Sequence, residues 1–171
     1  YAKFLPHINN NYDFQELLSE ILGELNGSHT GGRYSPQANN PDITATLGLL
    51  YDQKSNENGL KVTEVIQGGP FDKADSKLKV GATITKIDNE TITNDVDWAR
   101  FLNRKVGKNT LISGVDANGV AFQESVKPIT FGEETTLMYN RWIKRMNTMV
   151  DKLSDGKVGY VHVQGMNDGS F

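Results

Sequence analysis

The residues of this sequence with the most evident chemical use are Ser28 and His29, which are neighbours in a glycine-rich stretch. An imidazole accepts a proton near neutral pH, so a histidine that is held in place can act as a general base. Serine, glycine and histidine are also common in ordinary loops, and the pair by itself is more often a plain turn. Whether this histidine is held in a fixed orientation therefore depends on the neighbouring secondary-structure elements.

An amphipathic helix is predicted directly before the pair. Asp13 and Glu16 predict a capping box at its start, and Gly27 predicts its end, because glycine readily takes the left-handed conformation that terminates helices. Ser28 and His29 would then lie directly after a rigid helix. The apolar residues that recur at helical spacing and define its buried stripe are Phe14, Leu17, Leu18, Ile21, Leu22 and Leu25.

The complete string of residues 23–31, GELNGSHTG, at the end of this helix resembles the segment that carries the catalytic histidine in tricorn-type and carboxyl-terminal-processing serine peptidases. The resemblance implies that His29 is the general base and that Ser28 orients its ring. In that family the histidine activates a serine much later in the chain. We therefore expect the nucleophile to lie outside residues 1–171, and this chain alone to be inactive.

Composition excludes several other classes of function. The chain has 171 residues, 37% of them hydrophobic, a net charge of -3 and no cysteine, so neither a disulfide framework nor thiol chemistry is expected. The weak acidity argues against nucleic acid as a partner, and no apolar run approaches the roughly 20 residues of a membrane span. The sequence has only three histidines, at scattered positions: His7, His29 and His162. We therefore expect no metal site and no cofactor.

The sequence pattern changes from helical to β-type after a connecting segment. Residues 32–42 are rich in Pro, Asn, Gly and Ser, which places a domain boundary after a first unit of residues 1–42. Short β-type runs follow, separated by turn signals. They cover residues 44–51, 60–67, 83–88, 110–115 and 120–126.

Two local signals connect the later runs. Asn118 and Gly119 predict a two-residue type I′ hairpin between the last two runs. Asn94 is expected to cap a helix between the third and fourth runs. The apolar face of that helix would be formed by Trp98, Phe101 and Leu102.

The order of these elements resembles a PDZ domain over residues 43–129, and we assign residues 43–131 to it. Two departures from the peptidase modules occur: Thr46 stands where the carboxylate-binding loop often has its first glycine, and Ala82 stands where an aspartate is usual. The sequences that carry the likeness are Leu47-Gly48-Leu49-Leu50 for that loop, Gly69-Pro70-Phe71 with Ala74 for the short helix, and Leu78, Gly81 and residues 83–88 for the following turn and strand.

The resemblance implies a peptide-binding groove beside the loop. Gly48 would bring backbone N–H groups close to a peptide carboxylate, while Leu47, Leu49 and Leu102 would line a pocket. The alternative is that these three leucines belong simply to the core. Because Thr46 replaces the first glycine, we expect weak binding of a peptide or protein substrate, with its free C-terminus as one mode of presentation.

Residues 132–171 form a third segment in this interpretation. Apolar residues at helical spacing predict a long helix over 136–153, and the nearly continuous apolar run 157–163 predicts a strand buried on both faces of an α/β sheet. His162 in that run is expected to be a structural histidine with a satisfied partner. The fold class is therefore α+β: a helical segment, a partly open five-stranded PDZ-like barrel, and the first helix and strand of an incomplete α/β domain.

Two functions follow from these observations. The first is the N-terminal part of a serine peptidase whose PDZ module binds substrate peptides. The alternative is a PDZ peptide-binding adaptor without enzymatic activity, in which Ser28 and His29 are an ordinary turn. The sequence beyond Phe171 would separate them. The family resemblance favours a bacterial periplasm or cell envelope over cytoplasm, and the oligomeric state stays open.

Overall fold

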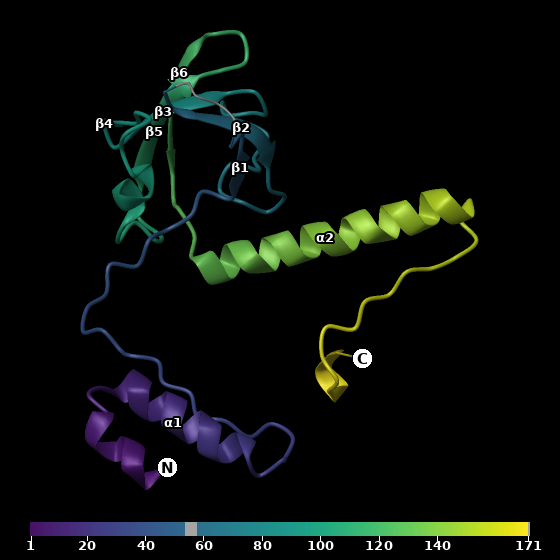
Figure 1. Ribbon diagram of the computed structural model, residues 1–171. Coiled ribbons are helices and arrows are strands. Elements are labelled where there is room, and N and C mark those ends of the chain that lie inside the picture. Colours follow the sequence, from purple (N-terminus) through teal and green to yellow (C-terminus); the bar gives the residue numbers. More distant parts are fainter. Residues whose placement is uncertain (54–57, 171) are drawn as a thin grey trace. The chain divides into compact units, whose positions relative to one another are not determined.

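The computed structural model describes residues 1–53 and 58–170. The chain forms two compact units, Tyr1–Pro41 and Asp42–Phe171. The first contains a short 3₁₀ helix, η1 (Ala2–His7), and the helix α1 (Asn11–Gly23), and the second contains all the strands (Figure 1). None of the helices in the described part of the chain is long and apolar enough to cross a membrane.

The predicted amphipathic helix is present as α1, but both of its ends differ from the prediction. The N-cap is Asn10, whose side chain accepts hydrogen bonds from the backbone N–H groups of Tyr12 and Asp13, so the proposed Asp13–Glu16 capping box is wrong. At the other end the helix stops at Gly23, and Asn26, not Gly27, takes the left-handed conformation with φ +48°. Asparagine tolerates this region, so the glycine is not required for it.

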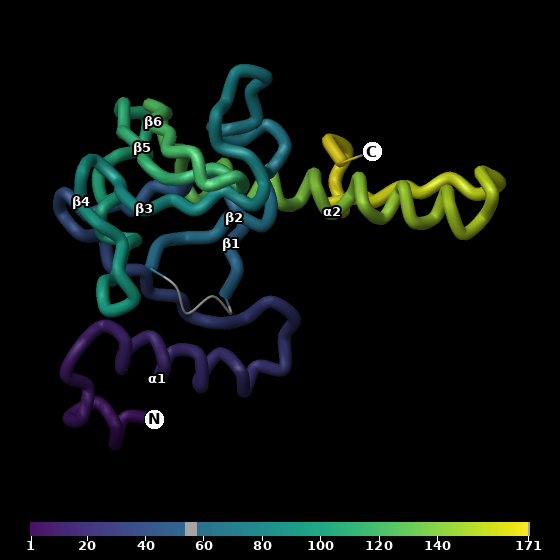
Figure 2. The backbone as a smooth tube through the Cα atoms, turned by 90° about the horizontal axis from the view of Figure 1, so that it is seen from above, coloured from purple at the N-terminus to yellow at the C-terminus, as the bar shows by residue number. Residues whose placement is uncertain are grey.

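The second unit is built on an antiparallel sheet in the order β1-β2-β3-β5-β6, with β4 paired to β3 (Figure 2). Each predicted β-type run contains one strand, and β4 is an addition. The first run is shorter than predicted, because Thr44 and Thr46 make only isolated bridges to Asn103 and Ile129. The strands are β1 (Leu49–Tyr51), β2 (Leu60–Val65), β3 (Thr83–Ile87), β4 (Glu90–Thr91), β5 (Thr110–Val115) and β6 (Ala121–Val126).

The two connections between the later strands differ from the prediction in turn type and in the N-cap residue. The β5–β6 turn is closed by the Gly119 N–H donating to the Asp116 carbonyl at 3.0 Å, and Gly119 has φ +82° while Asn118 stays at negative φ. It is therefore a type I turn followed by a left-handed glycine, not type I′. The helix before β5 is the short 3₁₀ helix η2 (Trp98–Leu102), and its N-cap is Asp97 instead of Asn94.

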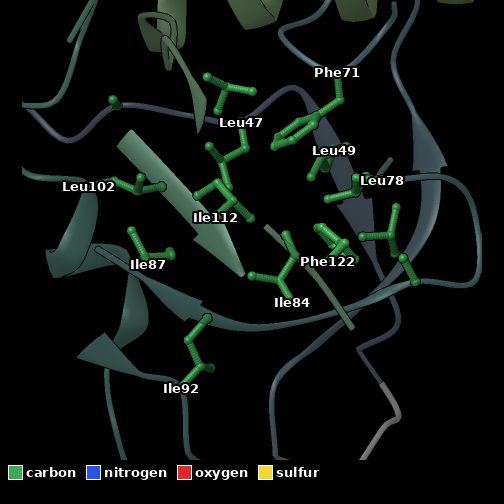
Figure 3. Packing of buried hydrophobic residues seen from close by; sticks show 14 residues of the cluster. Leu47, Leu49, Phe71, Leu78, Ile84, Ile87, Ile92, Leu102, Ile112 and Phe122 are labelled. Atoms are coloured by element: carbon green, nitrogen blue, oxygen red, sulfur yellow. The ribbon is translucent and has the colours of Figure 1, made fainter. Parts of the chain in front are cut away.

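The hydrophobic core of the second unit lies between the strands and η2. Figure 3 shows Leu47, Leu49 and Leu102 among its side chains. All three are buried, with exposed fractions of 2%, 4% and 1%, respectively. Ala82 is also buried, which explains why an apolar residue is suitable at that position. The mixed α+β class predicted from the sequence is confirmed.

A long helix, α2 (Phe131–Ser154), follows the sheet. It starts earlier than the predicted residue 136, because Thr130 and Glu133 form a capping box: the Thr130 hydroxyl accepts from the Glu133 N–H at 3.1 Å, and the Glu133 carboxylate accepts from the Thr130 N–H at 2.7 Å. The helix ends where Asp155 takes the left-handed conformation with φ +50°.

The strand predicted over residues 157–163 is not formed. The segment runs back along α2 (Figure 2), where His162 Nδ1 lies 2.7 Å from the Tyr139 hydroxyl and the His162 ring packs edge-on against Trp142 at 4.7 Å. A strand exists only with a hydrogen-bonded neighbour, and no strand of the described residues pairs with this one. His162 thus has the expected partner, but on an exposed segment instead of a buried strand.

Candidate functional site

The turn that carries Ser28 and His29 is fastened to the end of α1. The Thr30 hydroxyl lies within hydrogen-bond distance of two backbone carbonyls, at 3.1 Å from Leu22 O and 3.0 Å from Gly27 O. One short side chain therefore joins the residue after the histidine both to the last turn of the helix and to the start of the loop.

A second anchor holds the far side of the same turn. The Gly32 N–H donates to Ser19 Oγ at 3.2 Å, and the Ser19 hydroxyl lies 3.1 Å from the Gly32 carbonyl. Gly32 also lies close against the helix, since a Cβ there would come within 3.2 Å of Gln15 O and of Leu18 Cβ. Sequence reasoning missed Ser19 and Thr30 as anchors, because contacts between a helix and a loop folded onto it leave no periodic signal.

His29 itself is exposed and has φ +62°, a left-handed conformation that is uncommon outside glycine, although histidine is among the residues enriched in it. Ser28 is exposed as well, and the described contacts include no hydrogen bond between its hydroxyl and the His29 ring. The turn therefore presents an open imidazole on a backbone that is tied down on both sides. Chemically, such a group can accept and return a proton.

The predicted carboxylate-binding loop is built around Gly48, which has φ +65°. A Cβ at this position would lie 2.9 Å from Pro70 Cδ and 3.3 Å from Gly69 Cα, so a side chain would collide with the segment that packs on the loop. The Gly48 carbonyl accepts from the Ile66 N–H at 3.0 Å, which fixes the loop to the end of β2. Both the dihedral angle and the close packing require glycine here.

The four residues predicted for peptide binding lie together. Leu47, Leu49 and Leu102 form the apolar floor of a cavity of about 180 Å³, next to the Gly48 loop. These leucines are also almost fully buried, so they are core residues. A core role and a role in lining a peptide pocket are compatible, because the same three side chains also line the cavity. Among the residues 1–53 and 58–170, no group of three or more His, Cys, Asp or Glu side chains could hold a metal ion.

Among the other residues that line this cavity, Tyr51, Trp98 and Glu134 were not predicted from the sequence to belong to a binding site. Tyr51 and Trp98 pack edge-to-face with ring centroids 5.4 Å apart, so an aromatic pair from β1 and η2 forms part of the cavity lining. Burial, and to a smaller extent the negative charge of Glu134, raise the pKa of Tyr51 well above its usual value.

Comparison with known protein families identifies the class of domain in the second unit. The PDZ domain family matches residues 40–111, in agreement with the strand order and the loop at Gly48. The second unit therefore contains a PDZ domain.

Similarity to whole proteins extends further than this domain. The chain is 25% identical over 175 residues to a tricorn-like protease C-terminal subunit of Sulfurisphaera tokodaii, covering 97% of this chain and 20% of that protein. A tricorn protease homolog of Saccharolobus solfataricus is 22% identical over 97% of this chain and 16% of its own length. The crystal structure of the tricorn protease covers 94% of this chain and 16% of that chain, with 20% identity and a TM-score of 0.75.

These similarities confirm the predicted resemblance to the tricorn-type peptidases, with a protease-associated PDZ module. The chain spans a fifth or less of the length of these relatives.

Proposed function

We propose that the intact protein is a serine peptidase of the tricorn type, to which residues 1–171 contribute the catalytic histidine and a PDZ domain. The observation that carries this proposal is the extent of the similarity: 97% of the chain aligns with tricorn-type proteins, so the match includes the His29 turn as well as the PDZ domain. A PDZ adaptor would need only the second unit.

In the proposed mechanism, His29 takes the proton from a serine hydroxyl as that oxygen attacks the peptide carbonyl, and then gives the proton to the leaving amine. Water completes the cycle by hydrolysing the acyl-enzyme, again with His29 as base. Ser28 orients the ring. The nucleophilic serine is contributed from outside residues 1–171, which agrees with the small share of its relatives that this chain spans. The exposed imidazole on a doubly anchored turn supports this role, because it is accessible to another part of the protein.

Substitution of His29 by alanine in the intact protein tests the proposal. Loss of the base from a serine peptidase lowers turnover by about 10⁴- to 10⁶-fold. Hydrolysis of a chromogenic peptide should fall by this order while circular dichroism shows an unchanged fold. His7→Ala is the matched control, since His7 is an exposed histidine of the same unit and should retain activity. Ser28→Ala should cost less than His29→Ala. A folded His29→Ala variant with near-normal turnover would refute the assignment.

The PDZ domain is proposed to bind substrate peptides in the cavity beside Gly48. An extended peptide would lie along β1, with its last side chain over Leu47, Leu49 and Leu102. We expect micromolar or weaker affinity, because Thr46 stands in place of the first loop glycine. Titration with short peptides should move the amide resonances of residues 47–51 and 98–102. Shifts confined to other residues, or no response at millimolar peptide, would contradict this part of the proposal.

A further inference from the structure

A carboxylate of the protein itself already occupies the carboxylate-binding loop. The Gly48 backbone N–H donates to Glu134 Oε1 at 3.1 Å, although the two residues are 86 positions apart in the sequence. The backbone N–H groups of this loop are the ones expected to receive a peptide carboxylate. Glu134 comes from α2, lies half-buried, and lines the same cavity as Leu47 and Leu102.

The position of Glu134 follows from how α2 starts. Thr46 and Ile129 exchange two backbone hydrogen bonds, at 2.8 Å and 3.0 Å, so the segment that enters α2 is paired with the residues that enter the loop. Thr130 then caps the helix, and its carbonyl accepts from the Glu134 N–H at 3.0 Å. The first turn of α2 is thereby placed beside Gly48, with the Glu134 side chain directed to the loop.

The same face of α2 is fastened to the PDZ domain over the next turns. Arg141 makes two hydrogen bonds of 2.5 Å to the two carboxylate oxygens of Glu64 on β2. Lys144 donates to the Gln67 side chain at 2.9 Å. Residues 134, 141 and 144 share one helix face, because their spacings of seven and three residues keep them within about 80° of one another around the helix axis. Of these contacts, Glu134 is the one that reaches the peptide-binding cavity.

We propose that Glu134 is an internal ligand of the PDZ loop, and that a peptide with a free C-terminus must displace it to bind. This inference rests on the proposed peptide binding in the same cavity. Two carboxylates cannot accept the same Gly48 N–H, and like charges brought this close repel each other. Peptide binding is then coupled to release of the Glu134 side chain from the loop. By linkage, the Glu134–Gly48 contact lowers peptide affinity by the same factor by which bound peptide weakens that contact.

The experiment compares the 171-residue chain with its Glu134→Ala variant. The probe is a fluorescent pentapeptide that ends in valine, prepared once with a free carboxylate and once as the amide. Removal of a competing charge-assisted hydrogen bond should tighten binding of the free acid by about tenfold, with little gain for the amide. Glu133→Gln is the matched control, because it removes the same charge from the neighbouring residue, which bonds to Thr130 and not to the loop. Alanine is a good helix former, and Glu134→Gln provides a second variant that keeps the side-chain length.

The Gly48 amide resonance gives a readout that needs no peptide. It should shift in Glu134→Ala and stay in place in Glu133→Gln. An unchanged Gly48 resonance in Glu134→Ala would overturn the internal ligand and leave peptide binding intact. Equal peptide affinity of the wild type and Glu134→Ala would have the same meaning. If neither protein binds the free acid, the proposed peptide binding is wrong, and with it the displacement of Glu134 by a peptide, while the role of His29 is tested separately in the intact protein.

Discussion

Replacement of Gly48 by alanine tests whether the loop geometry is as tight as described. An L-residue in the left-handed conformation that Gly48 adopts at φ +65° costs about 1–2 kcal/mol. The added Cβ would meet Pro70 Cδ at 2.9 Å, and overpacking of this kind costs about 1–3 kcal/mol. Lower entropy of the unfolded chain returns about 0.5–1 kcal/mol. The free energy of unfolding should therefore fall by about 1–4.5 kcal/mol.

Urea unfolding followed by tryptophan fluorescence measures this change, because both tryptophans, Trp98 and Trp142, belong to the second unit. Gly107→Ala is the control: Gly107 has φ +68°, but no atom lies within 4 Å of a Cβ placed there. It should lose only about 0–1.5 kcal/mol, which is the dihedral cost less the same entropy return. If the two variants lose the same stability within about 0.5 kcal/mol, the collision with Pro70 is not real and the loop is looser than described.

Two further predictions concern single polar anchors. Burial favours a raised pKa for Asp88, but hydrogen bonds from Lys105 and from the Leu111 N–H, with the Lys105 charge, lower it overall. Because the folded-state pKa is lowered, ionised Asp88 stabilises the fold above the usual carboxyl range, and this stabilisation is lost as the pH falls through the folded-state pKa. In urea unfolding, Asp88→Asn should therefore lower the free energy of unfolding by about 1 kcal/mol at pH 7 and by progressively less below about pH 4. A difference that persists at pH 2 would refute this. Ser19→Ala should free Gly32 and raise hydrogen exchange of residues 28–32 by about tenfold, while equal exchange would show that Ser19 does not hold the turn.

Periodicity in the sequence predicted the helices, but not how they end. The apolar spacing located α1 and α2 because one face of each is apolar. The termination of α1 could not be read in the same way. Several residues near its end can adopt a left-handed conformation, and Asn26 takes it where Gly27 was predicted.

The apolar run 157–163 shows a second limit. Such a run indicates a segment that favours burial, but it does not state the partner. The strand predicted there needs a neighbouring strand, and the described chain instead brings the segment to Tyr139 and Trp142 on α2.

The two parts of the candidate site differ in how far the sequence could indicate them. Resemblance to a family pointed to His29 and to the Gly48 loop, because each lies in a short contiguous motif. Glu134 could not be found in this way, because its contact with Gly48 depends on the pairing of Thr46 with Ile129, which is long-range and carries no local pattern.

The central claim is that His29 activates a serine supplied from outside residues 1–171, and reaction with a fluorophosphonate probe followed by intact mass tests it most directly. The intact protein should gain one label on a serine beyond Phe171, and His29→Ala should slow this labelling by orders of magnitude. The 171-residue chain alone should gain none. Stoichiometric labelling of any serine within residues 1–171, or equal labelling rates for the wild type and His29→Ala, would contradict the account.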